Sequence, residues 1–309
     1  EKTGGEDVVR SLSELLDDPE ERVQLRAVRT LGDIGGDGAV PALVKALESD
    51  AVDVRMAAIE ALQRIDDDRA RQPLEKLAEK DSSPKVRRAA EEAVYQLSLR
   101  SDMVAHWSFD EMEDDTVKDL SGRGNHATNQ GCPSVKGKVG KALRFSKGNY
   151  VEVGKPPGLP IANKPLTIMA WAKAEAPNGV VVARGGAFQG FSLYIMDGVP
   201  KFGIHREQEG PAFIAAGGEN VVGPWVHLAG VVKEDCVELY VNGKLAARSD
   251  SKGYIPGNAG QPMEIGFDVN NSPAEITDNF DGIIDEVKVF HAALTAEEII
   301  KQAPLNQDN

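Results

Sequence analysis

Oxygen-bearing side chains with the character of a cation site occur at two separate places in the sequence. Asp119 and Asn125 enclose a short segment with two glycines, which allows a loop to bend around an ion. Asp285 lies far along the chain within the apolar segment IIDEVKVF, where a carboxylate must be hydrogen-bonded, paired or bound to a metal. Because calcium binds roughly six to eight oxygens, we predict a structural Ca²⁺ ion held by Asp119, Asn125, Asp285 and either Asp110 or Glu111.

The alternation of side chains along a strand directs two of these acids inward. A period of two places Asp285 in step with the apolar residues Ile283 and Val287, and Glu111 in step with Trp107. An alternative needs no metal, because Asp285 could accept backbone N–H groups while the loop aspartate caps a turn.

A second set of residues has the chemistry of a sugar site, which needs an aromatic ring beside planar polar groups. Alternation in GFSLYIM and KFGIHRE turns Tyr194 and His205 away from their apolar neighbours. In LTIMAWAKA, Trp171 falls on the face opposite the aliphatic residues. We expect Trp171, Tyr194 and His205 to share one sheet face with Arg184, the alternative being that Trp171 is a core residue.

Short strands must position these side chains. Of the 17 aromatic residues, 16 follow residue 100, as do 25 of the 31 glycines, and the β-branched runs there are separated by Gly, Asn and Pro. Asn242-Gly243 is a strong hairpin signal, and Thr295 with Glu298 forms a capping-box pattern for a closing helix. Residues 101–309 are therefore predicted to form an antiparallel β-sandwich of the jelly-roll type.

The first hundred residues have the composition of helices and repeat internally. A valine recurs at Val23, Val54 and Val86, each followed four and eight residues later by Ala and by Leu or Val. A leucine of a second helix recurs at Leu12, Leu43 and Leu74. Aspartates that precede the valine helices are candidate N-caps, namely Asp18, Asp50 and Asp81. Residues 1–100 are predicted to form an α-solenoid of helix pairs.

These helix pairs resemble short bacterial HEAT-like repeats over residues 7–98. The resemblance implies a surface for a protein partner, and a helical spacer with solvated charges is the alternative. In the second part, seven segments occur in the order found in laminin-G-like jelly rolls of the concanavalin A-like lectin and glucanase class. They are HWSFDE, KDLSGRGNHA, GKALRFSKGNYVEV, PLTIMAWAKA, WVHLAGVV, LYVNGKLAA and DGIIDEVKVFHAALTAEEI.

That resemblance spans about residues 104–303 and implies recognition of glycans or glycoproteins, often with calcium. The second part is also similar to pentraxins. The likeness makes Asp268 and Asn270 candidate ligand-binding residues in the loop before the last strand, and a solvated polar loop is the alternative.

The formal charge of −14 and pI of about 4.9 argue against nucleic acid or an anionic membrane as the main partner. No apolar run approaches the ~18 residues of a membrane span. Cys132 and Cys236 are too few for a disulfide framework, and their pairing stays open. The chain begins at Glu1 without a signal segment, so we expect it to be a processed piece of a longer protein.

Catalytic motifs are lacking. The Glu-x-Asp-x-x-Glu spacing that places two carboxylates on one glucanase strand does not occur, and neither does a nucleophile elbow or a phosphate-binding loop. The resemblance, together with this lack, implies a non-catalytic, bacterial, carbohydrate-binding module on a helical spacer, located outside the cell or in the envelope. It would be the accessory end of a secreted polysaccharide-processing protein. The alternative is a protein–protein adhesion or scaffold unit without a sugar site.

Overall fold

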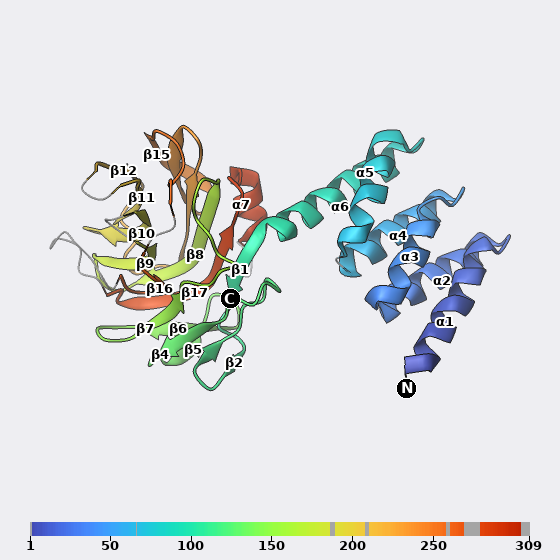
Figure 1. Ribbon diagram of the computed structural model, residues 1–309, viewed down its shortest axis with the longest axis horizontal. Coiled ribbons are helices and arrows are strands. Elements are labelled where there is room, and N and C mark those ends of the chain that lie inside the picture. Colours follow the sequence, from blue (N-terminus) through green and yellow to red (C-terminus); the bar gives the residue numbers. More distant parts are fainter. Residues whose placement is uncertain are drawn as a thin grey trace. The chain divides into compact units, whose positions relative to one another are not determined.

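The computed structural model describes residues 2–65, 67–185, 189–207, 210–257, 260–268 and 279–303. The chain divides into two compact units, Glu1–Ser101 and Asp102–Asn309, one built from helices and the other mainly from strands (Figure 1). The predicted fold class, an α-solenoid followed by an antiparallel β-sandwich, is confirmed. Among the described residues, no helix combines the length and the apolar character needed to cross a membrane.

The helical unit is a succession of helix pairs joined by short turns. Its segments are α1 (Lys2–Glu14), η1 (Leu15–Asp17), α2 (Glu21–Ile34), α3 (Gly36–Ala46), α4 (Val52–Ile65), η2 (Asp68–Ala70), α5 (Arg71–Lys80) and α6 (Pro84–Asp102). The repeated small residue of the predicted seam, Ala27 in α2 and Ala58 in α4, is buried, and α2 packs on α4. Alanine at this position allows the backbones of neighbouring helices to approach closely.

Two antiparallel sheets make up the sandwich within the described ranges. The β8 sheet has the order β15 (Lys244–Asp250), β14 (Cys236–Val241), β13 (Val226–Val232), β8 (Leu166–Ala174), β17 (Gly282–Phe290), β6 (Lys141–Phe145) and β5 (Ser134–Lys136), and β1 (Met103–Trp107) also pairs with β17. The β10 sheet has the order β12 (Ala212–Ala216), β11 (Val199–His205), β10 (Gly190–Met196), β9 (Gly179–Arg184), β16 (Met263–Ile265), β7 (Tyr150–Gly154), β4 (Ala127–Gln130), β3 (Thr116–Val117) and β2 (Met112–Glu113).

Large apolar side chains between the two sheets form the core. Trp107, Phe145, Phe191 and Phe202 are each at most 1% exposed and belong to one continuous cluster. Removal of such aromatic surface from water is the main stabilising contribution to a sandwich of this kind. The two cysteines are buried free thiols, so they do not form a disulfide.

Local signals at two turns predicted the structure correctly. Asn242 and Gly243 both have positive φ angles, 49° and 75°, which a two-residue hairpin between β14 and β15 requires. Helix α7 (Ala296–Gln302) begins with the predicted capping box, in which Thr295 accepts the Glu298 N–H and the Glu298 side chain accepts the Thr295 N–H.

Strict alternation fails at two positions, and two predictions based on it are wrong. A β-bulge between Asp285 and Lys288, with Glu286 at a φ of 51°, places Ile284 and Val287 in the core and turns Asp285 to the opposite face. After Trp107, a φ of 64° at Phe109 interrupts the strand. The Glu111 side chain is consequently 68% exposed instead of pointing inward.

Candidate functional site

The Asp119 carboxylate is the centre of a hydrogen-bonded loop. Its Oδ1 accepts the backbone N–H groups of His106 and Ser121, both at 2.9 Å. Its Oδ2 accepts the Ser121 hydroxyl at 2.8 Å and the Asn125 N–H at 2.9 Å. Donors of the protein therefore surround both oxygens of this buried group, and they hold the loop against β1.

Asn125, the second predicted ligand, also fastens the loop to β1. Its Nδ2 donates to the Val104 carbonyl at 2.6 Å, and its own carbonyl accepts the Trp107 indole N–H at 2.9 Å. The amide side chain is 2% exposed. Asn125 thus links the loop to β1, whose Trp107 is fully buried in the core.

Asp285 and Asp110 lie at a different place, the turn between β5 and β6. Asp285 Oδ2 accepts the Val139 N–H at 2.9 Å, while Asp110 Oδ1 accepts the Lys141 N–H at 2.6 Å. The turn approaches so closely that a Cβ on Gly137 would lie 2.5 Å from Asp285 Oδ2. The other oxygen of Asp285 is buried and has no hydrogen-bond partner within the described residues.

The predicted calcium ligands therefore form two separate groups instead of one shell. Protein donors surround Asp119, and Asn125 donates to Asp119 and to the Val104 carbonyl. Asp285 and Asp110 bind the β5–β6 turn, and Glu111 points into solvent beside Lys118. Nowhere in the described part of the chain do three His, Cys, Asp or Glu side chains come together in a way that could hold a metal ion. The described residues do not fit a calcium shell, and calcium stays a prediction of the sequence.

Trp171 lies on the β8 sheet, away from the other predicted sugar-binding residues. Its cross-strand neighbours are His227 and Asp285, and its ring meets the His227 ring edge-on with centroids 5.3 Å apart. Lys138 Nζ lies 5.2 Å from the Trp171 ring centroid. Because Trp171 is only 4% exposed, the alternative of a buried tryptophan agrees with the structure better than a sugar platform.

Burial shifts the pKa values of both cross-strand neighbours of Trp171. It raises the pKa of Asp285 to about 7, since the carboxylate has lost its water. Burial, aided by the positive charge of Lys288, lowers the pKa of His227 to about 3. At neutral pH the imidazole is therefore neutral, and its Nδ1 and the Trp171 Nε1 have no hydrogen-bond partner in the described structure.

Arg184 is also absent from the expected face. At the end of β9 it pairs with Phe191 and Met263, both core residues, and it donates to the Leu159 carbonyl. Arg184 is 4% exposed, and burial lowers its pKa. The side chain binds a backbone segment and is not available to a ligand.

Tyr194 and His205 do share a surface, the outward side of the β10 sheet, where they lie four strand positions apart. Their strand neighbours Phe191, Leu193, Phe202 and Ile204 belong to the core, so alternation turns the intervening residues outward. We call this surface the β10 face; its residues are Ser192, Tyr194, Lys201, His205 and Ile214.

Chemically, the β10 face combines an apolar residue with neutral and charged donors. Ile214 is 40% exposed and lies opposite Gly203, and its side chain leans over that glycine, since a Cβ on Gly203 would lie 3.1 Å from Ile214 Cγ1. Burial lowers the pKa of His205, so its imidazole is neutral at pH 7. Tyr194 is only 5% exposed and packs with Val180, Ala183 and Met196, so its ring is closed to stacking.

The remaining predicted residues lie beyond β16. Asp268 is 7% exposed and is the last described residue before residue 279. Asn270 lies outside the described residues. Of the four predicted sugar-binding residues that lie on described strands, Tyr194 and His205 are on the β10 face, whereas Trp171 and Arg184 are not.

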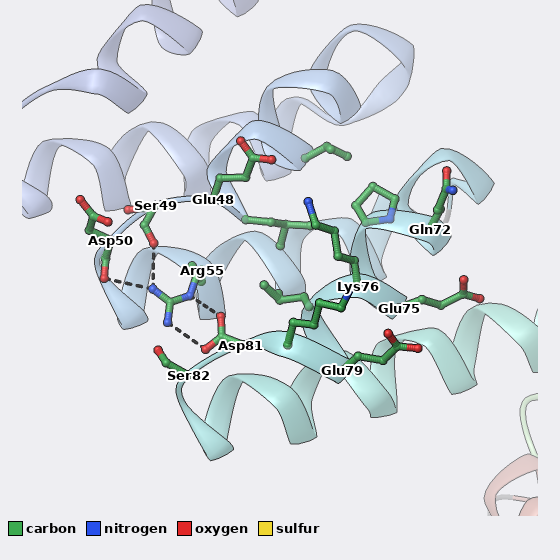
Figure 2. Close-up of a pocket in the computed structure, with 15 residues that line it drawn as sticks. Glu48, Ser49, Asp50, Arg55, Gln72, Glu75, Lys76, Glu79, Asp81 and Ser82 are labelled. Carbon is green, nitrogen blue, oxygen red and sulfur yellow. Dashed lines mark hydrogen bonds and ion pairs between the residues drawn. The ribbon is translucent and has the colours of Figure 1, made fainter.

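A recess of about 900 Å³ in the helical unit was not predicted (Figure 2). Arg55 and Asp81 form an ion pair there, with Nε–Oδ2 at 2.8 Å and Nη2–Oδ1 at 2.9 Å. Although burial alone would raise the pKa of Asp81, the Arg55 hydrogen bond lowers it. The charged residues that also line the recess are Glu48, Asp50, Glu75, Lys76, Glu79 and Lys80.

Sequence reasoning also missed three residues of the β10 face: Ser192, Lys201 and Ile214. A signal for Lys201 was present, because the Asp197-Gly198 turn, with φ angles of 55° and 77°, sets the register that pairs Tyr194 with Lys201. For Ile214 the signal was weak, since β12 is a short edge strand.

Comparison with solved structures finds the sandwich in bacterial toxin domains. The binding domain of Paraclostridial Mosquitocidal Protein 1 matches with a TM-score of 0.54 at 18% identity, covering 66% of this chain and 52% of that one. The binding domain of botulinum neurotoxin serotype D matches with a TM-score of 0.51 at 16% identity, covering 66% and 51%. A structure of botulinum neurotoxin type C, whose uptake into cells depends on interaction with two ganglioside molecules, matches with a TM-score of 0.54 at 14% identity, covering 69% and 53%.

These likenesses concern the fold alone, and the chain spans about half the length of the toxin domains it matches. No significantly similar sequence was found among curated proteins. Two family models match the chain itself, one for HEAT repeats over residues 9–94 and one for the concanavalin A-like fold over residues 145–300. The second match covers half of the sequence, and the chain therefore belongs to the concanavalin A-like lectin/glucanases superfamily.

Proposed function

We propose that the β-sandwich is a non-catalytic carbohydrate-binding module whose ligand lies on the β10 face. The observation that carries this proposal is that an exposed isoleucine and neutral hydrogen-bonding groups share one outward sheet face of a lectin-family sandwich. Sugar rings present both C–H surface and hydroxyl groups, so they need this combination of apolar and polar contacts.

Each group of the β10 face has a distinct part in such binding. Ile214 covers the C–H side of a sugar ring, and the Ser192 hydroxyl both donates and accepts. The Nδ1 of the neutral His205 imidazole is buried, so Nε2 is the nitrogen that meets a sugar hydroxyl group. Lys201 Nζ, 3.1 Å from Met196 Sδ, adds a donor at the rim.

Lack of catalysis is part of the proposal. None of the five residues of the β10 face carries a carboxylate, whereas glycoside hydrolysis uses a pair of them. The toxin domains with the same fold are named for binding, which supports recognition as the use of this sandwich, although the likeness itself concerns only the fold.

A glycan array probed with the full chain tests this function. We expect retention on a defined set of glycans, loss of that retention for His205→Ala and Ile214→Ser, and an unchanged pattern for Leu245→Ser, a 53% exposed apolar residue on β15 of the other sheet. Parallel arms with Ca²⁺ and with EDTA measure whether calcium takes part. A folded chain that retains no glycan in either arm contradicts the proposal.

The helical unit is proposed to be a spacer that positions the module within a larger protein. A module of this kind serves a polysaccharide-processing protein outside the cell or in the bacterial envelope, which is the location we propose. The alternative, a protein–protein scaffold, rests on the recess beside Arg55, whose rim carries both signs of charge (Figure 2). A silent glycan array together with a protein partner whose binding is lost on Glu75→Lys would favour the scaffold.

A further inference from the structure

A pair of aromatic rings lies on the same outward side of the β10 sheet, several strands away from the β10 face. Tyr150 in β7 and Phe267 after β16 meet with ring centroids 5.3 Å apart and ring planes at 41°. Tyr150 points outward because its neighbour Val151 belongs to the core, and successive side chains of a strand alternate. Both aromatic residues are partly exposed, whereas Tyr194 on the β10 face is closed to stacking.

One glycine turns Phe267 away from the core. Gly266 follows β16 with a φ of 78°, a backbone conformation that residues with a side chain rarely adopt. A Cβ at this position would overlap the ring of Phe145, a fully buried core residue. Glycine therefore lets the backbone pass closely over Phe145, so that the next residue, Phe267, lies beside Tyr150.

Two carboxylates and an amide border these rings. Glu152 is exposed in β7 and lies directly opposite Glu264 in β16, which is 3% exposed. Gln130, the cross-strand neighbour of Tyr150, donates from Nε2 to Glu152 Oε2 at 3.2 Å. Burial raises the pKa of Tyr150, and the negative charges of Glu152 and Glu264 raise it further, so both charges act at this ring. We call Tyr150, Phe267, Gln130, Glu152 and Glu264 the β7 site.

The opposed carboxylates are unfavourable for the sheet itself, because like charges directly opposite each other destabilise an antiparallel pair. Among the described residues, Glu152 accepts the hydrogen bond from Gln130 but forms no ion pair with a lysine or arginine. A cation beside Glu152 would relieve the repulsion. Glu264 is almost enclosed by the protein, so the site does not present the two accessible carboxyl groups that glycoside hydrolysis uses.

One row of cross-strand neighbours joins the β7 site to the β10 face. Ser192 of the β10 face pairs with Ala183, Ala183 pairs with Glu264, and Glu264 pairs with Glu152. The row crosses from β10 to β7 over about 14 Å, since neighbouring strands of a sheet lie roughly 4.8 Å apart. A linear glycan that runs across the strands can therefore contact both surfaces at once.

The groups of the β7 site fit a sugar that carries an ammonium group. Aromatic faces cover the C–H side of a sugar ring and also attract a cation, and a carboxylate accepts the N–H donors of that cation. A calcium ion would need about six to eight oxygen ligands, and aromatic rings provide none. A neutral, N-acetylated sugar would use the rings but would gain nothing from the charge of Glu152.

We propose that the β7 site is a subsite for a sugar residue with a free amino group, within a linear glycan whose other residues lie on the β10 face. Tyr150 and Phe267 cover the C–H surface of this residue, and Glu152 binds its ammonium group. Glu264 adds to the negative potential without touching the ligand. This inference rests on the proposed function and names the class of glycan, a polymer that contains unacetylated amino sugars.

Two tetrasaccharides that differ only in acetylation provide the test. The 1,4-linked tetramer of glucosamine carries ammonium groups at pH 6, and its fully N-acetylated counterpart is neutral. Calorimetry with the full chain in 50 mM NaCl measures both dissociation constants. We expect the glucosamine tetramer to bind at least tenfold more tightly. This preference should shrink at least threefold in 500 mM NaCl, because salt screens an exposed charge pair.

Two variants with the same change of net charge separate the β7 site from the overall charge of the chain. Glu152→Gln should reduce the preference to less than threefold and leave the affinity for the N-acetylated tetramer within twofold of the parent. Asp250→Asn, which alters a 94% exposed side chain on β15 of the other sheet, should leave the preference unchanged. Tyr150→Ala should weaken binding of both tetramers at least fivefold, whereas Tyr150→Phe, which keeps the ring, should weaken neither.

The results that would overturn this inference differ from those that would overturn the proposed function. Equal affinities of the parent for the two tetramers, or a preference that persists in Glu152→Gln, would overturn the inference. A chain that binds neutral glycans through His205 but does not bind the glucosamine tetramer would also overturn it, and the proposed function would stand. If neither tetramer binds and the glycan array is silent, the proposed function fails and this inference fails with it.

Discussion

Single residues of this protein show how donors of the protein itself can pair with a buried carboxylate. Asp119 accepts four hydrogen bonds from N–H and O–H donors, a number that occupies both of its oxygens. Sequence patterns identify such a residue as unusual but do not reveal its partners, because loop donors and a cation provide the same compensation for burial.

Removal of the Asp119 carboxylate leaves these donors unpaired. We expect Asp119→Ala to lower the free energy of unfolding by about 3 kcal/mol, since hydrogen bonds to a charged group contribute about 1.5–3 kcal/mol each and do not add fully. Urea denaturation of the β-sandwich measures the change. Glu111→Ala, whose side chain is exposed, is the control and should stay within about 0.5 kcal/mol of the parent. Equal effects of the two substitutions would contradict the assigned role of Asp119.

Calcium is tested by its removal. Because both carboxylate oxygens of Asp119 accept hydrogen bonds from the protein, we expect the melting temperature to be the same in EDTA as in millimolar Ca²⁺. A calcium-dependent rise of several degrees would establish a cation site after all, since a ligand that binds only the folded state stabilises it.

At the scale of elements, three residues form a row across neighbouring strands: His227 in β13, Trp171 in β8 and Asp285 in β17. Two buried titratable groups, whose pKa values are shifted in opposite directions, therefore lie on either side of the Trp171 ring. Asp285 has a pKa of about 7, raised by burial and by the neighbouring charge of Glu286. His227 has a pKa of about 3, lowered by burial and by the charge of Lys288. Their contributions to pH-dependent stability are therefore opposite in sign.

Between pH 4 and 6.5, Asp285 is protonated in the folded state and ionised in the unfolded state, so its contribution to stability falls as the pH rises. In the same interval, His227 is neutral when folded and charged when unfolded, so its contribution rises with pH. The two contributions nearly cancel in the parent protein.

Single substitutions should reveal how each residue changes the free energy of unfolding with pH. Relative to the parent, Asp285→Asn should gain stability as the pH rises from 4 to 6.5, by at most about 1.4 kcal/mol per pH unit, whereas His227→Gln should lose stability over that range. Chemical denaturation at several pH values measures both differences. Parallel pH profiles for the two variants and the parent would contradict the assigned environments.

The sequence predicted elements well where the signal was local. The capping box of α7 and the Asn242-Gly243 hairpin depend on neighbouring residues, and both are confirmed. The bulge at Glu286 was not predictable, because one extra residue reverses the direction of Asp285 without a local signature. Trp171 and Tyr194 were expected on one face, but strand order, which places them in different sheets, is a property of the whole topology.

For the whole molecule, the charge of −14 limits which partners bind through electrostatics. A neutral glycan held by the β10 face forms hydrogen bonds and apolar contacts, which salt screens little. We therefore expect the dissociation constant for a neutral glycan to change less than twofold between 50 and 500 mM NaCl. Equilibrium titration measures it, and a tenfold weakening in high salt would indicate an ionic partner instead.

The most direct test of the central claim is the affinity of the full chain for the glycan it retains best, measured by calorimetry for the parent and three variants. The β10 face predicts a loss of at least tenfold for His205→Ala and for Ile214→Ser, with Leu245→Ser on the other sheet within twofold of the parent. All three variants should keep the melting temperature of the sandwich. Equal affinities for all four proteins would contradict binding at the β10 face.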